Sequence, residues 1–183
     1  MKRVLILGDS ISISYREKVK EKLKGLCEVV FPEENGQFTY YTLWALHIWI
    51  KQLGKPDIVH WNNGLWDTHH EPPRVEALTP INVYEENLRR IITELRRYDN
   101  PQIIWASTIP AHYNFKERSN YEIDQYNAAA AKVMKEENIP VNDLHSLIKK
   151  DIGGYICEDM VHLTEEAAEL CAQQVADTIK KYL

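Results

Sequence analysis

Residues 1–23 of the chain read MKRVLILGDSISISYREKVKEKL, and this stretch decides the fold. The apolar run Val4–Leu7 predicts a short strand that breaks at Gly8-Asp9-Ser10, and a stretch with helical spacing follows. Ser10 therefore lies on a turn from a strand into a helix. A serine there projects its hydroxyl from the carboxyl edge of a sheet, next to helix N–H groups that have no acceptor within the helix. Such a turn suits a nucleophile, because these N–H groups can bind a developing oxyanion.

The composition is typical of one globular domain, which we expect to span residues 1–183. The 22 basic and 27 acidic residues give a net charge of −5 without a basic cluster, which argues against nucleic acid as a partner. The three cysteines are odd in number and lack the spacing of metal ligands, which favours reduced thiols and a cytoplasmic location. Lys2-Arg3 and the apolar run after it resemble a signal peptide, but the run is too short. No stretch approaches the length of a membrane span, so we expect no membrane partner.

Apolar runs alternate with stretches of helical spacing, which is typical of a parallel sheet covered by helices on both faces. The expected strands are Val4–Leu7, Cys27–Phe31, Asp57–Trp61, Gln102–Ser107 and Ile139–Asn142. The expected helices run from about Tyr15 to Leu26, from a cap at Thr42 to Leu53, from about Tyr84 to Tyr98, from Asn120 to about Glu137, and onward from Thr164. This pattern predicts a flavodoxin-like, three-layer α/β/α fold with strand order 2-1-3-4-5, whose ligand site lies beside the first and third strands.

A second motif, Asp159-Met160-Val161-His162, precedes the last predicted helix and would open onto the same sheet edge as Ser10. A serine hydroxyl becomes a good nucleophile when an imidazole takes its proton and a carboxylate orients that imidazole. The spacing of Asp159 and His162 places both side chains on one side of a single turn. Each motif alone has a plainer explanation as a turn with a helix cap. Together they predict a serine hydrolase site.

Gly8-Asp9-Ser10-Ile11 and Asp159-Met160-Val161-His162 resemble the first and last motif blocks of the SGNH, or GDSL-like, hydrolase family. The likeness extends over nearly the whole chain. It implies the three-layer fold and cofactor-free hydrolysis of an acyl ester, with Ser10, Asp159 and His162 as catalytic residues. We expect a small-molecule substrate with an acetyl or other short acyl group, and an acetylated carbohydrate is one candidate.

The two middle motif blocks of the family match less well. In the family, a glycine after the second strand gives a backbone N–H to the oxyanion hole, and Gly36 stands at that place, although it also fits a plain Asn-Gly turn. The third block is Gly-x-Asn-Asp, whose asparagine amide is a further donor, but this chain has Gly64-Leu65-Trp66-Asp67. Trp66 thus replaces the amide.

The missing amide leaves two alternatives open. Asn62 or Asn63, at the end of the third strand, could supply the donor; strand alternation directs only one of them to a given face, and we favour Asn62. The expected oxyanion hole then combines Ser10, Gly36 and one of these asparagines. The loss of one donor costs about 3 to 4 kcal/mol of transition-state stabilisation. Without compensation, the chain would be a catalytically weak protein that binds a ligand and does not cleave it.

Several loop residues are expected to rim the carboxyl edge of the sheet, where aromatic walls suit sugar rings or acyl chains: Trp66, His69, His112 and Tyr113. Closure of the loops onto the core is the plainer explanation for each of them. Adjacent histidines point apart in an extended chain, so His69-His70-Glu71 does not predict a metal site.

The other aromatic residues, and the turn that follows the first predicted strand, do not indicate a bound cofactor. His60 with Trp61 predicts packing against the sheet, and Trp44 with Trp49 predicts packing of a helix. A flavin or nucleotide protein is the least favoured function, because no glycine-rich phosphate loop follows the first strand.

Overall fold

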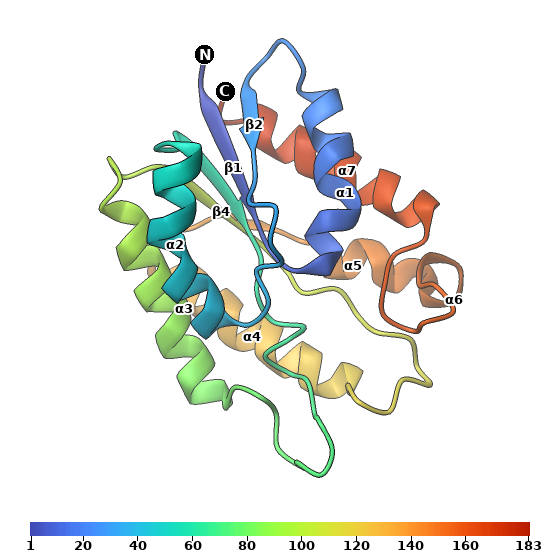
Figure 1. Cartoon of the computed structure of the whole chain (residues 1–183). Helices are drawn as coiled ribbons and strands as arrows, with labels where there is room; N and C mark the ends of the chain where they lie inside the picture. The colour runs from blue at the N-terminus through green and yellow to red at the C-terminus, as the bar shows by residue number, and fades with distance from the viewer.

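Five parallel strands form one sheet in the computed structural model, which describes residues 1–183 (Figure 1). The strands are β1 (Arg3–Leu7), β2 (Glu28–Val30), β3 (Ile58–Trp61), β4 (Gln102–Ala106) and β5 (Val141–Asn142). Their order is β2-β1-β3-β4-β5. The predicted fold class and strand order are thereby confirmed, and β1 and β3 lie side by side at the centre.

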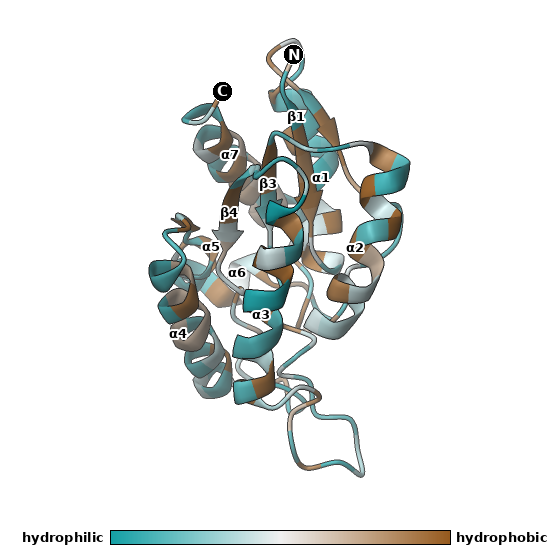
Figure 2. Cartoon of the chain, turned by 90° about the vertical axis from the view of Figure 1, so that its left-hand side faces the viewer, coloured by the Kyte–Doolittle hydropathy of each residue, from teal (hydrophilic) through white to brown (hydrophobic).

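Helices cover both faces of the sheet and give three layers (Figures 1 and 2). One face carries α1 (Ser10–Lys22), α5 (Leu144–Ile148) and α7 (Glu165–Lys180). The other face carries α2 (Thr39–Leu53), α3 (Ile81–Arg96) and α4 (Asn120–Glu136). None of the helices combines the length and the apolar character needed to cross a membrane.

The side chains of β1 alternate between two core clusters. Val4 and Ile6 pack under α1 and α7, whereas Leu5 and Leu7 pack under α2 and α3. All four are at most 1% exposed. A strand buried on both faces has a continuous apolar sequence, and this explains why the run in β1 is such a clear strand signal.

Two helices begin earlier than their sequence pattern predicts, because their first turns are capped by carboxylates. Helix α1 begins at Ser10, where Oδ1 of Asp9 accepts the N–H of Ile11 at 2.9 Å. Helix α2 begins at Thr39, whose N–H and hydroxyl both donate to Asp67 in the loop after β3. Thr42 is therefore not the cap; its hydroxyl donates to the Gly36 carbonyl at 2.8 Å.

The segment between β5 and α7 contains helical turns that the sequence pattern did not predict. They are α5, a 3-10 turn at Lys149–Asp151, and α6 (Ile152–Tyr155). The prediction for Trp44 was also wrong. Trp49 packs in the core as expected, but Trp44 is 60% exposed.

Candidate active site

Ser10 and His162 meet at the carboxyl edge of the sheet, although 152 residues separate them in the chain. The His162 Nε2 atom lies 2.9 Å from the Ser10 Oγ atom. On the other side of the ring, Nδ1 lies 2.7 Å from Oδ2 of Asp159. The three side chains predicted to act together therefore form one hydrogen-bonded chain.

The loop before α7 is shaped around the Asp159 carboxylate. Its Oδ1 atom accepts the backbone N–H groups of Val161 at 3.0 Å and His162 at 2.9 Å. Met160, which lies between Asp159 and Val161, has a left-handed backbone with φ of 69°. The His162 carbonyl accepts the N–H of Cys157 at 2.7 Å, and this hydrogen bond joins the two ends of the loop. Asp159 thus fixes both the backbone and the ring of the histidine.

The same hydrogen bonds determine the charge of Asp159. The N–H groups of His162 and Val161, followed by the imidazole, lower the pKa of this carboxyl to about 2. Asp159 is therefore an anion at neutral pH. Its side chain is 51% exposed and that of His162 is 46% exposed, so the pair sits at the mouth of the site and not in a closed pocket.

A second carboxylate, Asp9, lies buried directly beneath the Ser10 turn. Burial raises its pKa to about 6, although the Ile11 N–H and the charges of Arg118 and His162 act in the opposite direction. Its Oδ2 atom has no hydrogen-bond partner. The carboxylate of Asp67 is also buried, and its burial likewise raises the pKa to about 6.

The predicted oxyanion donors at Gly36, Asn62 and Asn63 are already hydrogen-bonded within the fold. The Gly36 N–H donates to the Gly8 carbonyl at 2.9 Å. The Asn62 amide donates to the Ala106 carbonyl at 2.7 Å and more weakly to Thr108 Oγ1 at 3.4 Å. The Asn63 amide donates to the Gln37 carbonyl and to Thr42 Oγ1. An amide has two donor hydrogens, so neither asparagine has one to spare for an oxyanion.

Ser10 differs from these residues because it is the first residue of α1, so its N–H has no acceptor within the helix. Of the expected oxyanion donors, only this backbone N–H is therefore free.

The residues predicted to bind substrate lie in the two long loops after β3 and β4. Trp66 is partly buried, and its ring centre lies 6.4 Å from that of His69. His69 contacts Glu71 through Nε2 at 2.6 Å. The His112 N–H donates to the Met160 carbonyl, which joins its loop to the loop of His162, and the neighbouring Tyr113 is 71% exposed.

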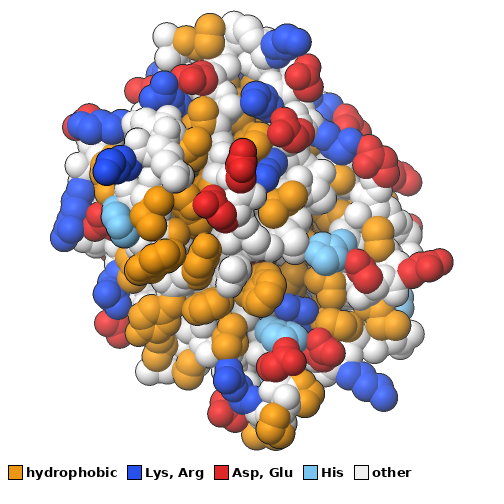
Figure 3. Space-filling view, in the orientation of Figure 1, with side chains coloured by type: hydrophobic (Ala, Val, Ile, Leu, Met, Phe, Trp, Pro, Cys, Tyr) orange, Lys and Arg blue, Asp and Glu red, His pale blue; other side chains and the backbone are white.

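Hydrophobic side chains gather over the lower half of the face shown in Figure 3, and the histidines on this face stand apart at its left, its right and its lower centre. No group of three or more His, Cys, Asp or Glu side chains in the structure is arranged to hold a metal ion. The three cysteines are unpaired.

Sequence reasoning missed Arg118, which lies at this edge. Its Nε atom donates to the Leu65 carbonyl at 2.7 Å, its guanidinium lies 5.5 Å from the centre of the Phe115 ring, and its charge acts on Asp9. The sequence carries no signal for this contact, because Arg118 is a single basic residue in a loop without periodicity.

The model of the GDSL-like lipase/acylhydrolase family matches residues 6–170, and the chain belongs to this family. It is thus a hydrolase that cleaves esters. No match was found among curated proteins.

Solved structures of acylhydrolases share the fold over almost their whole length. A lipase/acylhydrolase from Enterococcus faecalis is 22% identical with a TM-score of 0.86, over 100% of this chain and 97% of that one. The acetyl xylan esterase AlAXEase is 17% identical with a TM-score of 0.82, over 97% and 99%. The W215I variant of Axe2, an acetyl xylan esterase from Geobacillus stearothermophilus, is 18% identical with a TM-score of 0.81, over 97% and 94%. At these identities the similarity establishes the fold.

Proposed function

We propose that this protein is a serine esterase that removes a small acyl group, acetyl or another short chain, through an acyl-enzyme intermediate. The observation that carries the proposal is the hydrogen-bonded chain from Ser10 through His162 to Asp159. In this arrangement the hydroxyl, the imidazole and the carboxylate are already in the order that nucleophilic attack requires.

The reaction follows from the atoms in contact. Ser10 Oγ adds to the ester carbonyl while its proton passes to His162 Nε2, and Asp159 stabilises the resulting imidazolium. Collapse of the tetrahedral intermediate expels the alcohol, which takes the proton from His162. Water activated by the same imidazole then releases the acid and restores Ser10.

One feature of the site supports the choice of substrate. The half-exposed His162 and Asp159 leave the alcohol side open to solvent, which suits an alcohol as bulky as a carbohydrate. The acetyl xylan esterases among the structural neighbours make acetylated xylo-oligosaccharides the first substrates to test.

The test is hydrolysis of p-nitrophenyl acetate and labelling by a fluorophosphonate. We expect Ser10→Ala to abolish both, while the matched control Ser14→Ala, on the same helix, retains them. Full labelling of Ser10→Ala would refute Ser10 as the nucleophile. A comparison of acetyl, butyryl and octanoyl esters, with acetylated xylo-oligosaccharides alongside, then tests the acyl and alcohol specificity.

A further inference from the structure

Ester hydrolases typically stabilise the oxyanion with more than one donor, and all but one of the donors expected here are hydrogen-bonded within the fold. Donors aimed at the oxyanion are typically worth about 10²- to 10³-fold in kcat each. The donors of Gly36, Asn62 and Asn63 are committed elsewhere, so of the expected set only the Ser10 N–H remains. A side-chain donor must therefore come from another residue if the site is to work well.

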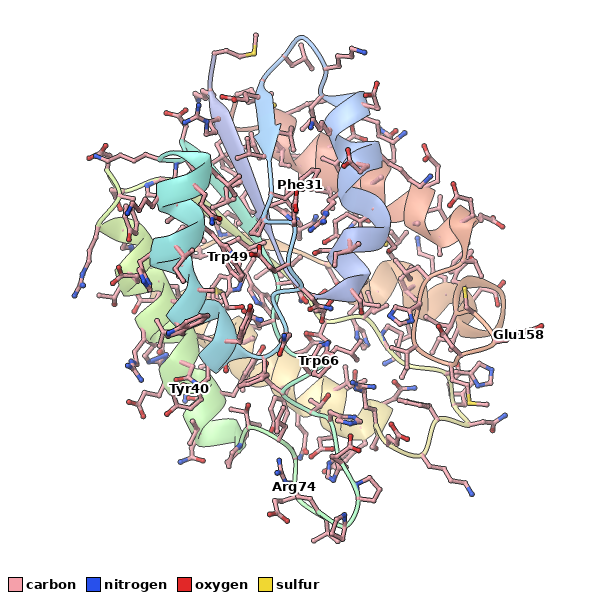
Figure 4. The ribbon with its side chains drawn as sticks, in the orientation of Figure 1. Phe31, Tyr40, Trp49, Trp66, Arg74 and Glu158 are labelled. Carbon is pink, nitrogen blue, oxygen red and sulfur yellow. The ribbon has the colours of Figure 1, made fainter.

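The neighbours of Trp66 place this residue between the N-termini of α1 and α2. Leu65 lines the same small cavity as Ile11 and Ser12, in the first turn of α1. Asp67 caps Thr39, the first residue of α2. Trp66 thus lies in the loop after β3, between a residue that shares a cavity with the first turn of α1 and a residue that caps α2, and Figure 4 labels its side chain at this end of the sheet.

The indole N–H of Trp66 is available as a donor. The Trp61 N–H donates to Asn63 Oδ1 at 2.6 Å, whereas the Trp66 N–H donates to no protein group. Trp66 is only partly buried, so a ligand can reach this edge. A tryptophan N–H that has no protein acceptor at this edge of the sheet is free to donate to an oxygen atom of a ligand.

Arg118 holds the Leu65-Trp66 segment in place. Its planar guanidinium donates through Nε to the Leu65 carbonyl and lies over the Phe115 ring, so it is fixed from two sides. Its charge also acts on Asp9, the residue before the nucleophile. The positive charge of Arg118 therefore favours negative charge at Asp9 and at the turn that follows it.

We propose that the Trp66 indole N–H is the side-chain donor to the oxyanion, at the motif position where the family has an asparagine amide, and that Arg118 is the positioning residue for it. The proposal rests on the proposed function. When Ser10 Oγ bonds to the carbonyl carbon, the electron pair of the C=O bond moves to oxygen, and the Ser10 N–H and the Trp66 N–H donate to that oxygen. The two hydrogen bonds to this oxygen weaken when the C=O bond re-forms and the alcohol leaves.

The first experiment separates the N–H from the aromatic ring. Trp66→Phe keeps an aromatic side chain and removes the donor, and we expect kcat for p-nitrophenyl acetate to fall about 10²-fold or more, with KM changed less than about threefold. Trp66→Asn restores an amide and is expected to exceed Trp66→Phe in kcat. The matched control Trp44→Phe, at the exposed tryptophan of α2, is expected to keep the kcat of the unmodified protein.

Arg118 is tested through its dependence on Trp66. Arg118→Ala and Arg118→Lys are expected to lower kcat about tenfold, because neither replacement supplies the planar Nε–H donor. In protein that already carries Trp66→Phe, we expect Arg118→Ala to lower kcat little further. A purely structural role for Arg118 would lower the thermal stability and leave the two effects on kcat additive.

A second measurement does not require that Trp66→Phe folds. Fluorophosphonate links phosphorus to Ser10 Oγ, fluoride leaves, and a phosphoryl oxygen takes the position of the oxyanion. In protein labelled with ¹⁵N-tryptophan, we expect the Trp66 indole signal to move downfield on this modification, with assignments from phenylalanine variants at the other four tryptophans.

The outcomes distinguish this inference from the proposed function. If Ser10→Ala abolishes hydrolysis but Trp66→Phe retains kcat, or the Trp66 signal does not move, the donor assignment is wrong and the esterase remains. If Trp66→Phe raises KM and leaves kcat unchanged, Trp66 contacts the bound substrate but does not donate to the oxyanion, and the donor assignment is wrong. If Trp66→Asn raises activity by orders of magnitude from near zero, the natural indole obstructs the hole, and both the donor assignment and the esterase proposal fail.

Discussion

Asp159 is joined to His162 twice: Oδ2 contacts the ring at Nδ1 at 2.7 Å, while Oδ1 accepts the backbone N–H of the same residue at 2.9 Å. The carboxylate therefore sets the position of the histidine backbone and the orientation of its ring together. This double contact is possible because the two residues are three positions apart, with the left-handed Met160 between them.

We expect Asp159→Asn to lower kcat about 10³- to 10⁴-fold, because an amide NH₂ facing Nδ1 favours the wrong tautomer of the imidazole. Asp177→Asn on α7, at a second exposed aspartate, serves as the matched control. The measurement is steady-state hydrolysis of p-nitrophenyl acetate, with melting curves to show that both variants fold. More than a tenth of the original kcat in Asp159→Asn would contradict the orienting role.

The pH profile of kcat/KM tests the histidine as the base. An imidazole accepts the Ser10 proton only when it is neutral, so we expect activity to fall about tenfold per pH unit on the acid side. Asp159, with its pKa lowered to about 2, remains ionised throughout this range and adds no second step of its own. A flat profile from pH 5 to 8 would be incompatible with His162 as the base.

The burial of His60 leads us to expect that the protein loses stability in acid. It is fully buried in β3, its Nδ1 atom has no partner, and burial lowers its pKa to about 4, against 6.5 in the unfolded chain. Above pH 6.5 His60 is neutral in both the folded and the unfolded chain and does not lower the free energy of unfolding. As the pH falls from 6.5 to 4, the unfolded chain binds a proton at His60 and the folded chain does not, so the free energy of unfolding declines by about 3 kcal/mol.

We expect His60→Gln to flatten this acid-side decline in urea unfolding curves. The glutamine oxygen can still accept the hydrogen bond that Asn142 gives to His60 Nε2. His47→Gln, at an exposed histidine of α2, is the control. If the decline between pH 6.5 and 4.5 is the same in His60→Gln, another group causes it.

The burial of the Asp9 carboxyl leads us to expect the opposite pH dependence of stability. Its folded pKa of about 6 exceeds the ordinary 3.8, so stability from this group is lost as the pH rises from 3.8 through 6. We expect Asp9→Asn, which can still cap Ile11, to be more stable than the unmodified protein by up to about 3 kcal/mol at pH 8 and to lose this advantage near pH 4. Asp151→Asn, at the exposed cap of α6, is the comparison. Equal gains at both pH values would exclude a buried charge as the cause.

The sheet order and the hydrogen-bonded arrangement of Ser10, His162 and Asp159 could be predicted because they depend on local patterns. β1 is a continuous apolar run, and the motifs at Ser10 and His162 occur at the carboxyl edge of such a sheet. The start of α2 could not be predicted, because its cap, Asp67, lies 28 residues from Thr39. The short α5 and α6, of five and four residues, contain too few turns to show a period.

The acceptors of the Asn62 and Asn63 amides could not be predicted for a related reason. Strand alternation correctly separates the two side chains, but it carries no information about their acceptors. Those acceptors, the carbonyls of Ala106 and Gln37, belong to other segments of the chain. The role of Arg118 was invisible for the same reason, since Leu65 is 53 residues away.

The Asp67 cap has a mechanical consequence. Because this carboxylate accepts the N–H and the hydroxyl of Thr39, the loop residue after Trp66 is bound to the first residue of α2. The loop that carries Trp66 is therefore anchored to a helix whose outer side, with Tyr40 and Trp44, faces solvent.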